Sequence, residues 1–174
     1  MPESHSLAFH NTQLTDEALP DVETVTFQKH PKRYLPYLLI TSLLPLTFIL
    51  VVGLALMLFG LFWWGMSTST FWAVLALLIS LEEIKGFPIR GYALRTHDIT
   101  YQKGWLFFSK VTVPFNRIQH GEIVQGPMAQ LFELSELRLY TAGGSISDLP
   151  IGGLPYDEAH RLREYVAKYS ATYD

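Results

Sequence analysis

The sequence contains no cysteine among its 174 residues. Disulfide bonds, thiol nucleophiles and metal sites with thiolate ligands are therefore excluded. The formal net charge is −3, so no overall positive charge favours binding to nucleic acid. Basic side chains are also missing locally, because residues 1–28 contain five acidic residues and neither lysine nor arginine. We interpret residues 1–33 as an acidic, flexible N-terminal segment.

The stretch from Tyr37 to Trp64 lacks charge altogether. About 20 apolar residues in a helix span the hydrocarbon core of a membrane, and this stretch has no polar stripe of the kind that a soluble core helix shows. It also begins too late and runs too long for a signal peptide. We predict a membrane helix at about 37–64, kinked at Pro45. Aromatic residues suited to the two membrane interfaces flank it: Tyr34, Tyr37, Trp63 and Trp64.

A second apolar stretch, Phe71–Leu81, follows the uncharged connection 65–70. It is short for a span, so it is either a second crossing at about 66–84 or an interfacial segment. Basic residues lie on both sides of the two stretches: Lys29, Lys32 and Arg33 before them, and Lys85, Arg90 and Arg95 after them. Basic flanks stay in the cytoplasm, and two crossings keep both flanks there. We predict a transmembrane hairpin within 34–84, with both termini cytoplasmic.

Residues 85–174 have the alternation of apolar and polar side chains that is typical of strands. A hairpin is expected around His97-Asp98, with further strands within 105–115, 118–126 and 137–141 and another after a turn at Gly143-Gly144. Residues 128–134 have helical spacing, and 155–170 predict an amphipathic helix with one apolar face. That face contains Ala159, Leu162, Val166 and Tyr169. The order predicts an antiparallel β-roll or partly open barrel capped by the terminal helix.

The segment 113–127 concentrates polar side chains: Arg117, Gln119, His120, Glu122 and Gln125. On a regular strand alternate residues share a face, so Ile118, His120 and Glu122 are expected on one side. One histidine and one carboxylate are too few for a metal site, and no nucleophile or phosphate-loop motif accompanies them. We interpret the segment as structural and expect no catalytic residue, metal or cofactor.

Four sequence segments occur in a characteristic order: HPKRYLPYLL (30–39), VPFNRIQH (113–120), QGPMAQLFEL (125–134) and TAGG (141–144). Together they resemble the YdbS-like membrane proteins with a bacterial pleckstrin-homology (PH) domain. The resemblance implies an α+β membrane protein of the bacterial inner membrane: two transmembrane helices, then a PH-like cytoplasmic domain at 85–174 with a C-terminal capping helix. It also implies no enzymatic activity.

The resemblance favours a protein-interaction and assembly module at the cytoplasmic membrane face. Family proteins are often encoded beside a larger membrane protein with several PH domains, which suggests a hetero-oligomer, with a homo-oligomer as the alternative. Some relatives are associated with envelope stress or antimicrobial tolerance, and the resemblance suggests that role here. Membrane lipids are expected partners because of the hairpin.

Two other functions stay open from the sequence. An anionic-lipid headgroup reader would use basic residues, but those available are dispersed. The candidate contacts to lipid or partner are Arg95, Lys103, Lys110 and Arg117. An accessory transporter subunit would need charge in the membrane centre, whereas Glu82 and Glu83 end the second helix and are interpreted as headgroup-level charges. Gly53 and Gly60 are a candidate helix contact.

Overall fold

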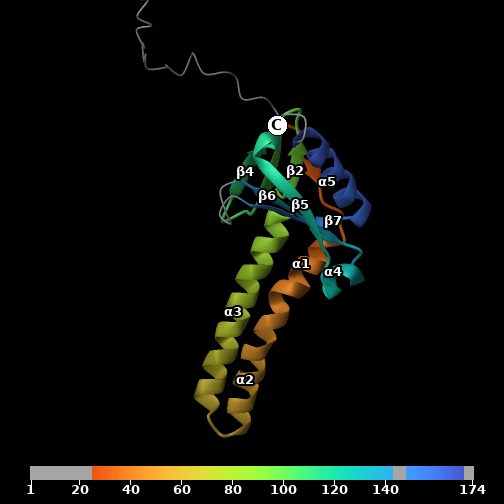
Figure 1. Ribbon diagram of the computed structural model, residues 1–174. Coiled ribbons are helices and arrows are strands. Elements are labelled where there is room, and N and C mark those ends of the chain that lie inside the picture. Colours follow the sequence, from red (N-terminus) through yellow and green to blue (C-terminus); the bar gives the residue numbers. More distant parts are fainter. Residues whose placement is uncertain (1–24, 143–147, 171–174) are drawn as a thin grey trace, which may run out of the picture.

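Figure 1 shows the computed structural model, which describes residues 25–142 and 148–170, except for the side chain of Ser170. A long helical hairpin projects from one end of a small β-rich domain (Figure 1). The predicted order of hairpin, antiparallel sheets and terminal helix is confirmed. Most of the acidic segment, residues 1–24, and the turn at Gly143-Gly144 lie outside the described residues.

The first arm of the hairpin is a helical run from Tyr34 to Leu58 that is long and apolar enough to cross a membrane. It consists of α1 (Tyr34–Leu43), the 3₁₀ turn η2 (Leu44–Leu46) and α2 (Thr47–Leu58). The 3₁₀ turn contains Pro45, whose ring removes a backbone donor from the helix. The helical run therefore changes from α to 3₁₀ geometry at the position where a kink was predicted.

The second arm is α3, Phe62–Gly86, a single helix of 25 residues that also passes the length and hydropathy test for a span. The two arms join at 59–61, where Gly60 has a φ of 81°. Left-handed backbone costs a glycine little because it has no Cβ. The hairpin reverses at this residue.

The prediction of a connection at 65–70 is wrong, because these residues lie within α3. Three of their four hydroxyl groups donate inside the helix, whereas the buried Ser69 Oγ has no hydrogen-bond partner. Thr68 Oγ1 donates to the carbonyl of Trp64 at 3.0 Å, and Thr70 Oγ1 donates to that of Met66 at 2.9 Å. Serine and threonine within a helix can donate to carbonyl groups one helical turn earlier in this way. The polar residues therefore did not mark the connection between the two arms.

Glycines bring the two arms into close contact, but the predicted pair was partly wrong. A Cβ on Gly53 would lie 2.6 Å from Ser69 Oγ, and one on Gly65 would lie 2.6 Å from the carbonyl oxygen of Gly53. Gly60 has no atom within 4 Å of such a Cβ. The close approach therefore joins Gly53 to Gly65 across the hairpin, as small residues do between membrane helices.

The β-rich domain contains two antiparallel sheets. The first has the order β1-β2-β3-β4, with the bounds Gln28–Lys29, Gly91–Leu94, Asp98–Lys103 and Ser109–Pro114. The second has the order β5-β6-β7, with the bounds Ile118–Val124, Ser135–Thr141 and Leu149–Leu154. The 3₁₀ turn η3 (Phe115–Arg117) links the sheets, and α4 (Pro127–Leu131) links β5 to β6.

Strand β1 lies in the segment that was expected to be flexible, and for residues 25–33 that expectation is wrong. Gln28 pairs with Tyr92 and Lys29 with Gly91, and His30 is buried. A two-residue strand shows no alternation, so its pairing depends on the distant strand β2. This pairing puts the chain before α1 and the chain after α3 at the same end of the hairpin.

The terminal helix α5, Tyr156–Ser170, covers one side of the sheets (Figure 1). Its predicted apolar face is confirmed, because Ala159, Leu162 and Val166 are buried and Tyr169 packs against the same core. Burying a side chain as large as Leu162 or Val166 contributes about 1.5–3 kcal/mol. The core residues that meet this face include Phe115, Ile118, Leu137, Leu139 and Ile151.

Candidate functional site at the helix–domain junction

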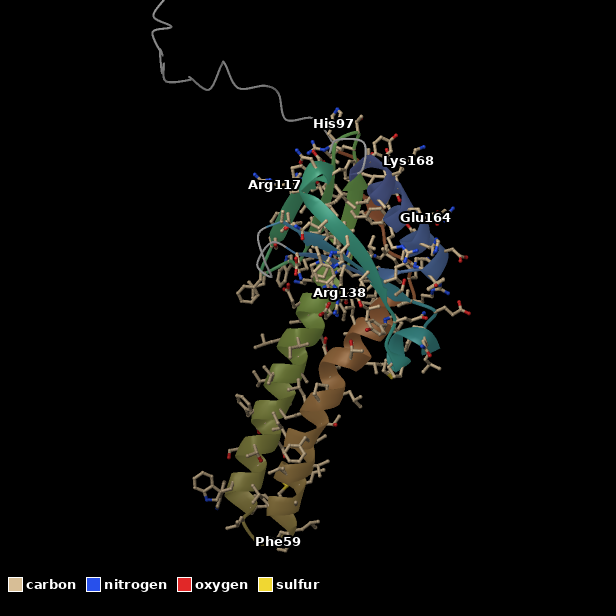
Figure 2. The ribbon with its side chains drawn as sticks, viewed as in Figure 1. Phe59, His97, Arg117, Arg138, Glu164 and Lys168 are labelled. Atoms are coloured by element: carbon tan, nitrogen blue, oxygen red, sulfur yellow. The ribbon has the colours of Figure 1, made fainter. Side chains whose placement is uncertain are left out.

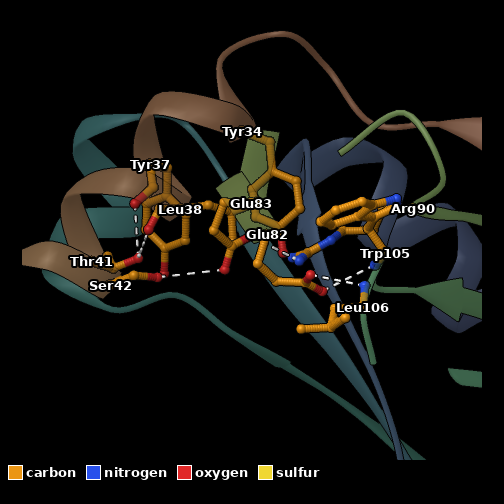
Figure 3. A network of polar contacts seen from close by, with 10 residues as sticks. All are labelled: Tyr34, Tyr37, Leu38, Thr41, Ser42, Glu82, Glu83, Arg90, Trp105 and Leu106. Atoms are coloured by element: carbon orange, nitrogen blue, oxygen red, sulfur yellow. Dashed lines mark hydrogen bonds and ion pairs between the residues drawn. The ribbon is translucent and has the colours of Figure 1, made fainter. Parts of the chain in front are cut away.

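A connected group of polar side chains lies where α3 passes into the first sheet (Figure 3). Arg90 donates from Nη2 to Glu83 Oε2 at 2.9 Å, and the two side chains are only 12% and 16% exposed. Arg90 also donates from Nη1 to Tyr34 Oη at 3.2 Å. Ser42 Oγ donates to the other oxygen of Glu83 at 3.5 Å. Glu83 therefore joins α1, α3 and the domain.

The neighbouring carboxylate, Glu82, binds a different part of the domain (Figure 3). It accepts hydrogen bonds from the backbone N–H groups of Trp105 and Leu106 at 3.0 and 2.9 Å. Both residues belong to the β3–β4 loop. Lys85 Nζ lies 4.3 Å from the centre of the Trp105 ring, within the range of a cation–π contact. The end of α3 is thus fastened to this loop.

Tyr34 was expected at the membrane interface, but the domain covers it. Its side chain is buried in a cluster with Leu38, Ala129 and Leu134. A Cβ on Gly153 of β7 would lie 2.4 Å from the Tyr34 ring, and Gly153 has a φ of 76°. Only glycine suits both the close approach and this backbone conformation. Tyr34 therefore anchors the domain to the hairpin.

His30 lies beside Tyr34, with ring centres 5.0 Å apart. Its Nδ1 is 3.4 Å from the carbonyl oxygen of Gly153, and its Nε2 has no partner. The rings of Tyr92 and Tyr101 complete the enclosure. Burial lowers the pKa of His30 from 6.5 to about 4, because the apolar surroundings disfavour the charged ring.

A cleft of about 250 Å³ opens beside this junction, between α1, α4 and the second sheet. Three of its polar side chains already have hydrogen-bond partners within the protein. Ser135 Oγ donates to the carbonyl of Leu154 at 3.1 Å, and Arg138 Nε donates to Glu136 Oε1 at 2.6 Å. The cleft therefore offers few free groups to orient a ligand.

The four candidate contact residues do not form one patch. Arg95 pairs with Asp98 at 2.7 Å in the β2–β3 turn, and Arg117 lies at the domain end far from the hairpin (Figure 2). Lys103 and Lys110 flank the β3–β4 loop, where Lys103 pairs with Ser109 and Gln102 with Lys110. Two candidates are thus near the hairpin and two are far from it.

The middle of the segment 113–127 lies on β5, and a register shift between Ile118 and His120 changes the expected faces of this strand. Ile118 is buried, whereas His120 and Glu122 are exposed, so the prediction that all three share a side is wrong. His120 stacks on Tyr140 with ring centres 4.5 Å apart, and Tyr140 Oη donates to Glu122 at 2.9 Å. Within the described residues no group of three metal-ligating side chains occurs.

The junction residues carried little signal in the sequence. Arg90 was noticed only as a basic flank and Tyr34 only as an interfacial aromatic. Their contacts span long separations: 56 residues between Arg90 and Tyr34, and 123 between His30 and Gly153. No local spacing encodes such pairs. Glu83 and Arg90 are seven residues apart. This separation would have indicated an ion pair only if the end of α3 between them had been known.

The sequence profile of the bacterial PH domain matches residues 34–170, which include the hairpin, strands β2 to β7 and α5, but not β1. The chain belongs to the bacterial PH domain family. It is 30% identical over 83 residues to the UPF0699 transmembrane protein YdbS of Bacillus subtilis (strain 168). That alignment covers 48% of this chain and 50% of YdbS, so the chain spans about half the length of this curated relative. No solved structure matches the chain significantly.

Membership of the family agrees with the architecture. The PH-like domain is held at one end of a hairpin whose two arms are each long and apolar enough to cross a membrane, and most of the arms' large apolar side chains are exposed. A soluble core helix would bury them. This bacterial PH protein is a YdbS-like membrane protein.

Proposed function

We propose that this bacterial PH protein is a non-enzymatic assembly module of the inner membrane, with both termini in the cytoplasm. The proposed partner is a second, larger membrane protein with several PH domains, and the proposed setting is envelope stress or antimicrobial tolerance. The basic residues at the domain end of the hairpin support this orientation: Lys29, Lys32, Arg33, Lys85 and Arg90.

The open edge of β4 is the observation that carries the proposal. Its six residues pair with β3 without any register shift, and β4 is the last strand of its sheet. Val111 lies opposite the buried Tyr101 but is itself 42% exposed. An added strand would pair with this edge and cover Val111, which is a common mode of recognition between domains.

The other strand edges suit this role less well. Strand β1 has only two residues. Strand β5 packs against α5, and both pairings of the second sheet contain register shifts, which interrupt a flat edge. Strand β4 is therefore the best edge for a neighbouring domain within the described part of the chain.

The junction supports the same proposal, because it fixes the direction in which β4 points. Glu82 and Glu83 fasten α3 to the β3–β4 loop and to Arg90, and Tyr34 packs against β7. A domain held in one orientation at the membrane surface can meet a second membrane protein without the orientational loss that slows free association.

Photo-crosslinking in living cells tests the assembly. We expect a benzophenone side chain at Thr112, which is exposed on β4, to give a discrete adduct whose partner contains a PH domain. The same group at Glu164, exposed on α5, should give none. An adduct with a second copy of this chain would contradict the hetero-oligomer and support a homo-oligomer. Adducts with lipid alone would contradict assembly through β4.

A further inference from the structure

The β3–β4 loop exposes four consecutive large apolar side chains. Trp105 is 46% exposed, Leu106 68%, Phe107 79% and Phe108 57%. Burying one such side chain is favourable by an amount comparable to a sizeable part of a domain's net stability. A contiguous apolar patch of this kind marks a surface that another apolar phase covers.

The loop lies at a defined height along α3. Its two backbone N–H groups bind the Glu82 carboxylate, and Glu82 follows Phe62, the first residue of α3, by 20 residues. At 1.5 Å per residue the separation is about 30 Å, which is the thickness of the hydrocarbon core. With Phe62 at one boundary of the core, Glu82 and the loop lie at the other.

The surroundings of the loop match this boundary. Lys85 lies over the Trp105 ring, and Lys103 is exposed immediately before the loop. Amphipathic tryptophan and long basic side chains are typical of the headgroup level. Gly104 allows the tight turn, because its φ is 86° and a Cβ there would lie 2.2 Å from the carbonyl oxygen of Phe107.

We propose that the Trp105–Phe108 loop inserts into the same leaflet in which α3 ends, as a third membrane contact beside the two helices. The loop is covered by the region of the bilayer where acyl chains meet headgroups, and not by a protein. The apolar surface of α3 and that of the loop then form one continuous lipid-facing surface. Insertion would hold the domain down on the membrane, with Lys103 and Lys110 at the phosphates.

Fluorescence of single labelled cysteines tests the insertion in the full chain, which has no native cysteine. Leu106→Cys and Phe107→Cys variants carry an environment-sensitive nitrobenzoxadiazole label and are reconstituted into phosphatidylcholine–phosphatidylglycerol vesicles. Asn116→Cys is the control, because η3 follows the opposite end of β4 and Asn116 is exposed. Unlabelled variants should keep the parent's melting temperature in detergent, since the replaced side chains are on the surface.

We expect the labels at 106 and 107 to emit at shorter wavelength than the label at 116. They should also lose emission when the vesicles contain lipids brominated near the top of the acyl chains. Emission at 106 and 107 that matches the control, with no loss from brominated lipid, would overturn the proposal. Equal quenching at 116 would overturn it too, because the loop would then have no special contact. Neither outcome depends on the proposed partner.

Discussion

Arg90 and Glu83 form a 2.9 Å ion pair across seven residues, at the point where the second membrane helix gives way to the first sheet. The pair is largely shielded from water, and Arg90 also reaches Tyr34 on the first helix. One guanidinium thus links both arms of the hairpin to the domain. This contact fixes how the domain sits on its anchor.

Breaking this pair should destabilise the junction. We expect Glu83→Gln to lower the free energy of unfolding by about 3 kcal/mol. The reason is that Arg90 stays charged and mostly buried but loses the carboxylate that compensates its charge. Thermal unfolding of the detergent-solubilised protein, followed by tryptophan fluorescence, measures the change.

A matched control is Glu136→Gln, which breaks the exposed pair with Arg138. It should cost less than about 1 kcal/mol. Adding Arg90→Met to Glu83→Gln should restore part of the loss, since the unpaired charge is then removed. Equal melting temperatures for Glu83→Gln and Glu136→Gln would show that the buried pair does not hold the junction.

His30 should make the stability depend on pH. Its pKa is lowered from 6.5 to about 4 in the folded chain, so the unfolded chain binds a proton first as the pH falls. The contribution of His30 to the free energy of unfolding is therefore complete above pH 6.5. It falls by up to about 3 kcal/mol as the pH is lowered to 4. Below that the loss is complete. Melting temperatures measured between these two values test the slope.

Replacing His30 by phenylalanine separates this effect from general acid sensitivity. The His30 Nε2 has no partner, and its Nδ1 contact is long, so the apolar ring should be accepted near pH 7. His30→Phe should flatten the pH dependence. His120→Gln, at an exposed ring outside the cluster, should leave it as in the parent. An unchanged slope in His30→Phe would rule out His30 as its source.

The close approach of the helices should make Gly65 intolerant of substitution. A Cβ there would lie 2.5 Å from Met57 Cγ and 2.6 Å from the backbone oxygen of Gly53. We expect Gly65→Val to cost about 2 kcal/mol or more through overpacking. Gly126→Ala is the control, because no atom lies within 4 Å of its added Cβ. Comparable melting temperatures for the two variants would be incompatible with this packing.

Much of the fold was readable from the sequence where its signal is local. The unbroken apolar stretch of the first arm and the apolar face of α5, with Ala159 and Val166, are periodic or compositional patterns. The turn of the hairpin was misplaced because Thr68 and Thr70 satisfy their hydroxyl groups within α3. Hydroxyl-rich sequence therefore did not mean a loop in this case.

The candidate site was largely hidden because its contacts are non-local. Strand β1 depends on pairing with a strand more than 60 residues away in sequence. The expected faces of β5 were wrong because its register with β6 shifts between Ile118 and His120, and the alternation within one strand does not encode its register with another. Glu83 was recognised as ending the helix, but its partners Arg90 and Tyr34 became apparent only in three dimensions.

The most direct test of the central claim, a two-arm anchor that keeps the PH domain in the cytoplasm, is cysteine labelling in intact cells. Phe59 lies at the tip of the hairpin and Glu164 on the domain (Figure 2), and both are exposed. A membrane-impermeant maleimide should label Phe59→Cys in intact cells and Glu164→Cys only after the inner membrane is opened. Labelling of Glu164→Cys in intact cells, with Phe59→Cys protected, would contradict the account.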